Sequence, residues 1–319
     1  MWQSSAMIEP RAFGFTERTD PGTTSVWLGR GVALAFMAML FSCSSPLTIG
    51  RDSGGAGAGG DATAETNGFV QVSAGYDHVC GLRRDGTVAC AGNNDLGQAT
   101  PPAGTFTQIA SGMDFTCGLQ GAGNVTCWGE PGFAGPFTQI SVAYDYDCGL
   151  RADGSVVCLD PFGPTLATTL TGTYTQISSG GFRTCGLATD GGVTCWIRND
   201  ECGLTPVPPP GAFTQISTGD CHVCGLRAGG GAACWGDNHF GETNVPGGTF
   251  AQISAGAEGT CGLRANGTVT CWGWQLSLGS KMTSPSGTFT QISVYGGMAC
   301  GLLADGSITC WGNPLTLEP

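Results

Sequence analysis

The residues that could do acid–base chemistry are few, and two of the three histidines recur at nearly the same place. His78 and His222 each lie two residues before a cysteine, and His239 lies in a polar stretch that is typical of a turn. Recurrence at an equivalent position indicates a structural or surface role and not a catalytic base. The histidines therefore supply no catalytic candidate.

Four aspartates occupy the same position in short Asp-Gly turns, where the side chain can accept hydrogen bonds from the local backbone. The positions are Asp85, Asp153, Asp190 and Asp305. Paired carboxylates for glycosidase chemistry cannot be recognised from spacing alone. The sequence has no EF-hand or RTX-like calcium pattern, and its glycine-rich segment 53–60 lacks the Gly-Lys-Ser/Thr of a phosphate loop. We expect no catalytic residue, no metal ion and no cofactor.

Fourteen of the 17 cysteines form pairs ten positions apart. The pairs are Cys80–Cys90, Cys117–Cys127, Cys148–Cys158, Cys185–Cys195, Cys224–Cys234, Cys261–Cys271 and Cys300–Cys310. Each pair flanks a turn such as Arg84-Asp85-Gly86, whose glycine suits a three-residue β-hairpin with a bulge. In that register the two cysteines oppose each other with Cβ atoms roughly 4.5–5.5 Å apart. We predict seven disulfides, each within one hairpin.

Three cysteines remain, and two of them lie between the fourth and fifth hairpins. We predict that Cys202 and Cys221 form an eighth disulfide. The alternative for Cys221-His222-Val223-Cys224 is a zinc or redox site, which is disfavoured because Cys224 already has a partner in Cys234. Such complete pairing indicates an oxidising compartment.

An apolar run of 11 residues follows Arg30 and is too short to span a bilayer, which takes about 20 residues. Its length suits a signal peptide. It ends in Leu40-Phe41-Ser42-Cys43, which resembles the lipobox of bacterial lipoproteins, although Phe41 departs from the small residue of that pattern. The resemblance implies a lipid on Cys43; ordinary signal cleavage nearby is the alternative. We expect a bacterial outer-membrane or cell-surface lipoprotein, held only by this anchor, or a secreted protein.

The chain therefore divides into three parts. Residues 1–42 are the signal-peptide region, with a true start near Val26 because residues 1–25 are acidic; residues 43–67 are a lipid-anchored, Gly/Ser-rich tether; and residues 68–319 fold. The net charge of −12 and the single lysine, Lys281, exclude a nucleic-acid partner. The 56 glycines require many turns, and 41% hydrophobic residues suffice for a core, so an all-β fold is expected.

The phrase aromatic-x-Gln-Ile/Val-Ser/Ala occurs seven times, at spacings of 31 to 39 residues. It begins at Phe69, Phe106, Phe137, Tyr174, Phe213, Phe250 and Phe289. Repeats of this length each form one supersecondary unit that must stack on its neighbours. An open solenoid needs atypical end repeats, yet the first and seventh copies are complete. We predict a closed seven-bladed β-propeller.

The phrases Gln-Ile-Ser-x-Gly and Cys-Gly-Leu-x-x-Asp-Gly-x-Val-x-Cys-Trp-Gly, with the tail Asn93-Asn-Asp-Leu-Gly-Gln98, resemble repeats of the regulator of chromosome condensation family. The resemblance covers residues 69–319 and is closest to secreted bacterial members with paired cysteines. It implies the propeller but leaves function open, because that family includes a nucleotide-exchange factor and a β-lactamase inhibitor. Nucleotide exchange on a cytosolic GTPase is disfavoured by the oxidising compartment. The first and third repeats have Ala91 and Leu159 in place of tryptophan, which we interpret as repeat drift, with a ligand-facing sector as the alternative.

We expect a monomeric binding module that presents propeller loops to a protein or a glycan. Aromatic residues predicted to lie in its loops are the candidate contacts. They are Phe133, Tyr144, Tyr146, Phe162, Phe240, Trp274 and Tyr295. The alternative is a carbohydrate-active hydrolase or lyase, which would need converging carboxylates or a metal at the channel mouth.

Overall fold

The computed structural model describes residues 48–49, 68–129, 135–144, 147–159, 168–181, 183–197, 202, 207–275 and 280–312. The chain divides into a unit of residues 1–43, which lies outside the described residues, and a unit of residues 44–319, which holds every described strand. The described segments contain strands and no helix, and accordingly no helix among them could cross a membrane.

Seven antiparallel sheets follow one another along the chain, and each sheet is one blade. Blade 1 comprises β2 (Phe69–Ala74), β3 (His78–Arg83) and β4 (Val88–Gly92). Blade 2 comprises β5 (Gln108–Ser111), β6 (Thr116–Leu119) and β7 (Val125–Trp128). Blade 3 comprises β8 (Gln139–Val142), β9 (Asp147–Leu150), β10 (Val156–Leu159) and β11 (Thr168–Leu170). Blades 4 and 5 comprise β12 (Tyr174–Ser179), β13 (Arg183–Ala188) and β14 (Val193–Ile197); and β15 (Gln215–Thr218), β16 (His222–Leu226) and β17 (Ala232–Gly236). Blades 6 and 7 comprise β18 (Gln252–Ala255), β19 (Gly259–Leu263), β20 (Val269–Gln275) and β21 (Ser280–Lys281); and β22 (Phe289–Tyr295), β23 (Met298–Leu303) and β24 (Ile308–Gly312).

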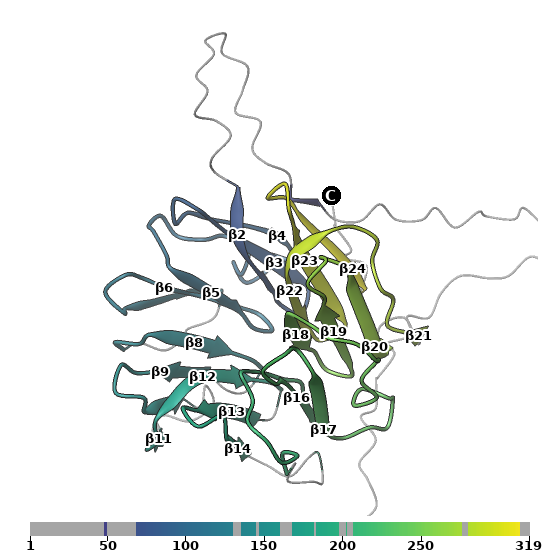
Figure 1. Ribbon diagram of the computed structural model, residues 1–319. Helices are drawn as coiled ribbons and strands as arrows, with labels where there is room; N and C mark the ends of the chain where they lie inside the picture. Colours follow the sequence, from purple (N-terminus) through teal and green to yellow (C-terminus); the bar gives the residue numbers. More distant parts are fainter. Residues whose placement is uncertain are drawn as a thin grey trace, which may run out of the picture. The chain divides into compact units, whose positions relative to one another are not determined.

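The seventh blade also receives a strand from the opposite end of the chain. The short strand β1 (Thr48–Ile49) pairs antiparallel with β24, with Thr48 opposite Thr309 and Ile49 opposite Ile308. In Figure 1 the first blade, β2 to β4, lies beside the last blade, β22 to β24. The predicted seven-bladed propeller is confirmed.

The hydrophobic core lies between neighbouring blades, because each sheet contributes apolar side chains to both of its faces. One cluster joins Leu82 of blade 1 to Phe106, Ile109 and Trp128 of blade 2. Another closes the ring by packing Phe69, Val72 and Val79 of blade 1 against Met298, Leu302 and Ile308 of blade 7. A single blade cannot bury these surfaces alone, so burial requires the ring.

The repeated glutamine ties each blade to the next. In blade 1 the Gln71 amide donates to the Ile109 carbonyl oxygen at 2.8 Å and accepts from the Ile109 amide nitrogen at 2.9 Å. All seven repeats place a glutamine oxygen on the following inner strand, ending with Gln291, which accepts from Val72 N at 2.7 Å. The recurring glutamine is thus explained by ring closure and not by chemistry.

A second ladder is built from the serine two positions after the glutamine. Ser73 Oγ accepts from Ser111 N at 2.9 Å, and Ser293 Oγ accepts from Ala74 N at 3.0 Å across the closing seam. Four more such bonds come from Ser141, Ser178, Ser217 and Ser254. Blade 2 has Ala110 at this position, so the ladder lacks the hydroxyl that would accept from Val142 N.

Replacement Ala110→Ser is expected to stabilise the protein. The new hydroxyl would accept from Val142 N and complete the ladder, a gain of about 0.5–1 kcal/mol. For a domain of this size that corresponds to a rise in melting temperature of roughly 2 °C. The matched variant Ser141→Ala should lower it by a similar amount; equal melting curves for both variants would count against the ladder as a source of stability.

The structure brings together the same eight cysteine pairs that the sequence spacing indicates. Seven join the second and third strands of a blade, with Cα atoms 4.0–4.1 Å apart, and Cys202–Cys221 joins two connections. The hairpin turns need a left-handed residue, supplied in blade 1 by Gly86 with φ of 87°. The many disulfides indicate an oxidising, extracytoplasmic location.

Candidate functional site

The strand directions give the propeller two distinct faces. The turns that join the second and third strands of every blade, such as residues 83–87, lie on one face, which we call the hairpin face. The connections between first and second strands, and those that leave the third strand, begin on the opposite face, the loop face.

The central channel is uncharged. Its volume is about 290 Å³, and the inner strands line it with the glutamine and serine ladders, together with small and aliphatic residues. Among the described residues that line it, only Tyr295 carries an ionisable side chain. Five of the seven glutamines donate from the amide nitrogen to a backbone carbonyl of the next blade. The channel therefore offers no acid–base pair.

The two recurring histidines are structural and wholly buried. His78 Nε2 lies 2.8 Å from Thr116 Oγ1, and His222 Nε2 lies 2.8 Å from Thr260 Oγ1. Each contact crosses from one blade to the next, between blades 1 and 2 or blades 5 and 6. The structural interpretation is confirmed, and the alternative of a surface position is wrong because both side chains are fully enclosed.

Acid is expected to weaken the fold through His222. Burial, and next the nearby Arg183 charge, lower its pKa from 6.5 to about 4. Between these two pKa values His222 is protonated in the unfolded chain but not in the folded one. The free energy of unfolding therefore falls as the pH drops from about 6.5 to about 4, by a total of about 3 kcal/mol. Chemical denaturation across this range should show the loss in the native protein and a smaller loss in His222→Gln. His239→Gln, which changes an exposed histidine, is the control. Equal dependence of stability on pH in the native protein and in His222→Gln would contradict the role of His222.

A buried carboxyl, Asp147, and a half-buried one, Asp220, lie beneath the loop face. Asp147, only 4% exposed, starts β9, and burial raises its pKa to about 7. Asp220 accepts a hydrogen bond from Gly181 N at 3.1 Å. Burial raises the Asp220 pKa, opposed by that bond and by the Arg183 charge. Neither residue lines the channel, so neither is placed to act on a substrate there.

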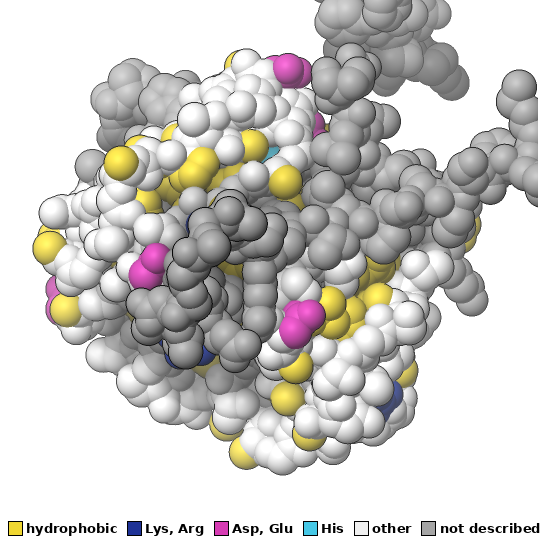
Figure 2. Space-filling view, turned by 90° about the horizontal axis from the view of Figure 1, so that it is seen from above, with side chains coloured by type: hydrophobic (Ala, Val, Ile, Leu, Met, Phe, Trp, Pro, Cys, Tyr) yellow, Lys and Arg dark blue, Asp and Glu magenta, His cyan; other side chains and the backbone are white. Residues whose placement is uncertain are grey.

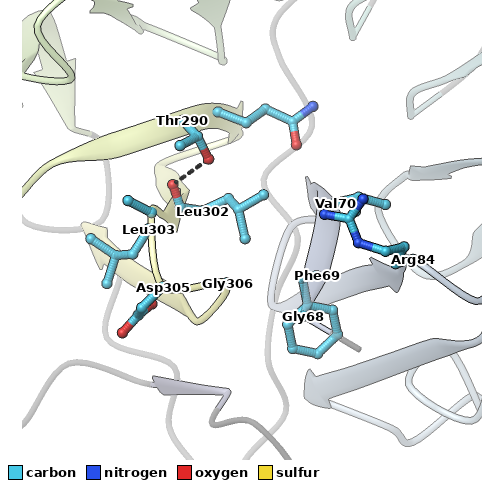
Figure 3. Close-up of a pocket in the computed structure, with 11 residues that line it drawn as sticks. Gly68, Phe69, Val70, Arg84, Thr290, Leu302, Leu303, Asp305 and Gly306 are labelled. Carbon is cyan, nitrogen blue, oxygen red and sulfur yellow. Dashed lines mark hydrogen bonds between the residues drawn. The ribbon is translucent and has the colours of Figure 1, made fainter. Parts of the chain in front are cut away.

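A groove lies on the hairpin face, at the seam between blades 7 and 1. Figure 3 shows Phe69, Val70 and Arg84 on one side and Leu302, Leu303 and Asp305 on the other. Its volume is about 690 Å³. A groove of about 490 Å³ between blades 3 and 4 is lined at the equivalent positions of those blades. The recurrence identifies both grooves as products of blade packing.

The hairpin face is electrically balanced. Five of the six arginines that the structure describes lie there, with the four turn aspartates. The arginines are Arg83, Arg84, Arg151, Arg227 and Arg264. Three of them cover a buried ring, and Arg264 lies 4.7 Å from the Phe250 ring centre. The aspartates accept from the backbone two residues on, as Asp85 does from Thr87 N at 2.9 Å, which confirms their role as turn formers.

The loop face is acidic. Eight of the described carboxylates lie on it or just beneath it, and the described basic residues on this side are the fully buried Arg183 and Lys281, which pairs with Trp274 at the end of β20. The carboxylates are Asp77, Asp95, Asp114, Asp147, Asp220, Asp237, Glu242 and Glu258. Four of the six large hydrophobic side chains that are exposed also lie here: Tyr76, Leu96, Tyr144 and Phe240. In the view of Figure 2 charged side chains are sparse and stand among uncharged ones.

Carboxylates and aromatic rings meet where the loop face spans blades 5 and 6. The rings of Phe240 and Trp274 stack at 6.0 Å, with an interplanar angle of 25°, and His239 packs edge-on against Phe240 at 4.7 Å. Four acidic residues, Asp220, Asp237, Glu242 and Glu258, lie close enough to interact electrostatically. No group of three or more potential ligands in the described part of the chain could hold a metal ion.

Four of the seven predicted contact aromatics are described. Tyr144 and Phe240 are exposed, and Trp274 stacks on Phe240. Tyr295 packs against the core and lines the channel. Phe133, Tyr146 and Phe162, like the predicted lipidation site Cys43, lie outside the described residues. Sequence reasoning missed Tyr76, 46% exposed, although it follows the inner strand as Tyr144 does.

The tryptophans that follow the second hairpin cysteine are structural. Each packs against the aromatic residue of its own blade, at 5.1 to 5.8 Å between ring centres. Trp272 also donates to the Glu242 carbonyl oxygen at 2.8 Å and so fixes the loop of blade 5. Ala91 packs against the core cluster at the ring-closing seam, and Leu159 packs against the cluster between blades 2 and 3.

Comparison with known proteins supports an RCC1-like β-propeller. Residues 69–98, 213–242 and 250–276 match the family model of the Regulator of chromosome condensation (RCC1) repeat. These segments fall in blades 1, 5 and 6 and include the acidic loop at residues 237–242. No curated protein matches the chain.

Solved structures with similar folds include two receptor ectodomains. The CRINKLY WD40 ectodomain of the Arabidopsis thaliana receptor kinase ACR4 is 23% identical, with a TM-score of 0.64, over 78% of this chain and 99% of that one. The ectodomain of the Physcomitrella patens receptor kinase CR4 is 26% identical, with a TM-score of 0.65, over 77% and 74%. Prp20p of Saccharomyces cerevisiae, a protein studied for binding to Gsp1p and histones, is 14% identical, with a TM-score of 0.61, over 76% and 82%.

Proposed function

We propose that the chain is an extracytoplasmic protein-interaction module that binds a positively charged protein surface on its loop face. The observation that carries the proposal is the separation of charge and exposed apolar groups between the faces. Among the described residues of this face, eight carboxylates outnumber the two basic residues, the buried Arg183 and Lys281, and this acidic excess attracts a cationic partner. Exposed Tyr76, Tyr144 and Phe240 provide apolar contact area.

The comparisons support a binding role by analogy. Two of the similar folds are receptor ectodomains, and a third belongs to a protein studied for its binding properties. The uncharged channel favours binding over catalysis, because acid–base chemistry needs a titratable group placed at the reacting bond. A neutral glycan as ligand would not require the excess of carboxylates.

Photo-cross-linking of the full chain tests which face binds. A cross-linking phenylalanine analogue replaces Tyr144 on the loop face or Thr189 at a hairpin turn, and the protein is irradiated in envelope and secreted fractions of its source. Binding on the loop face gives one saturable adduct from position 144 that disappears at high salt, and none from position 189. An adduct from position 189 alone would contradict the proposal.

We further propose that the module is exported as a lipoprotein anchored through Cys43, with residues 43–67 as its tether. The apolar run before Cys43 and the oxidised cysteines support this. Metabolic labelling with a fatty acid should label the native protein and leave Cys43→Ala unlabelled. An unlabelled native protein in the medium would instead indicate free secretion.

A further inference from the structure

Two loops of the same design provide a comparison within the molecule. Residues 93–98 leave blade 1 as Asn-Asn-Asp-Leu-Gly-Gln, and residues 237–242 leave blade 5 as Asp-Asn-His-Phe-Gly-Glu. In blade 1, Gln98 Oε1 accepts from Leu96 N at 2.9 Å, and its amide nitrogen donates to Asn93 Oδ1 at 3.3 Å. The first loop therefore carries one carboxylate, Asp95, and its Asn93 and Gln98 side chains are bonded to each other.

The blade 5 loop keeps the shape but replaces both amide side chains with carboxylates. Glu242 Oε2 accepts from Phe240 N at 2.8 Å, as Gln98 does from Leu96 N. Glu242 has no N–H where Gln98 has its amide, so the donor that joins the two side chains in blade 1 is gone, and Asp237 stands where Asn93 stands. Glu242 is only 2% exposed. The loop thus holds a nearly buried carboxylate, with a second carboxylate, Asp237, at its start.

The described groups that act on Glu258 are mostly acidic. Glu258 Oε2 is buried and has no hydrogen-bond partner among the described residues. Burial raises the Glu258 pKa, and Glu242, Asp220 and Asp237 raise it further, while His239 lowers it. Like charges held this closely repel, so a cation bound among them would relieve the repulsion.

A flat aromatic wall borders the carboxylates. Phe240 is 38% exposed and stacks with Trp274, whose backbone nitrogen donates to Glu258 O at 2.8 Å. A planar guanidinium can lie on an aromatic face while its N–H groups bind carboxylates, whereas a metal ion gains nothing from the rings. The absence of a metal-ligand group among the described residues points the same way.

We propose that this cluster, Asp237, Glu242 and Glu258 beside Phe240 and Trp274, binds an arginine side chain of the partner protein. The arginine lies against the exposed aromatic wall and pairs with the carboxylates. This inference rests on the proposed function and adds the position and the side chain that is recognised.

Binding of a fluorescein-labelled peptide with four arginines spaced by glycines, measured by anisotropy with the full chain at low salt, tests the site. The counterpart with citrulline removes the charge and keeps the shape. Glu258→Gln should weaken binding of the arginine peptide at least tenfold and Phe240→Ala about fivefold, whereas Asp95→Asn, the same charge change on blade 1, should alter it less than twofold. The citrulline peptide should not bind.

Melting curves exclude an effect through unfolding, because Glu258→Gln removes a like charge and should not lower the melting temperature. Equal weakening by Glu258→Gln and Asp95→Asn would overturn the site, as would stoichiometric Ca²⁺ that displaces the peptide. A missing peptide signal with an intact cross-link at position 144 would overturn this inference alone. Loss of that cross-link would remove the proposed function itself.

Discussion

Reduction of the disulfides is expected to unfold the propeller. Each of the seven hairpin bonds closes a loop across a sequence separation of 10, which the chain-entropy estimate places just under ~3 kcal/mol. Together they contribute on the order of 20 kcal/mol, more than the roughly 5–15 kcal/mol by which a domain is normally stable. Far-UV circular dichroism in a strong thiol reductant should show loss of the native β-sheet signal at room temperature.

Removal of one disulfide measures the contribution of a single bond. The double variant Cys224→Ala with Cys234→Ala should lose up to about 3 kcal/mol and remain folded, because the other bonds persist. Removal of Cys202 and Cys221, which join connections, should leave the hairpins intact. A reduced protein that melts within a few degrees of the oxidised one would show that the blades are held by packing alone.

Replacement Asp147→Asn is expected to stabilise the protein strongly above neutral pH. Burial raises the Asp147 pKa from 3.8 to about 7, so the folded state disfavours the charged form. That cost is absent below pH about 4, grows as the pH rises through about 7, and is complete at pH 8, at about 4 kcal/mol. The variant should melt roughly 8–16 °C higher than the native protein at pH 8.

The stabilisation by Asp147→Asn depends on whether Asp147 is ionised, so a measurement at low pH provides the control. At pH 4 both states of the native protein hold much of the proton, so Asp147→Asn should differ little from it. The fully exposed Asp153 gives the same charge change without the burial. A gain from Asp147→Asn that is as large at pH 4 as at pH 8 would attribute the effect to packing.

The architecture was predictable because its determinants are local. The register that opposes Cys80 to Cys90 follows from ten positions and one turn, and the structure has it, with Leu82 opposite Val88. Seven complete copies of one unit, without atypical end repeats, then predict a closed ring. The turn aspartates were equally local, since Asp85 binds a group two residues away.

The remainder depended on which loops meet across blades, and spacing does not encode that. The glutamine was visible as a repeat, but its bond to Ile109 of the next blade exists only in the ring. Glu242 and Glu258 belong to different repeats and come together on one face. The pairing of Ile49 with Ile308 spans almost the whole sequence. Acidic residues that are scattered along the sequence therefore gather on one face, the loop face, and leave the hairpin face balanced.

The measurement that tests the central claim most directly is hydrogen–deuterium exchange of the full chain, alone and saturated with the partner recovered by cross-linking. Binding on the loop face should slow exchange at residues 74–78, 93–98, 237–242 and 256–259 and leave the hairpin turns unchanged. Protection confined to the turns at residues 83–87, 227–231 and 303–307 would contradict the account, because it would place the partner on the balanced face.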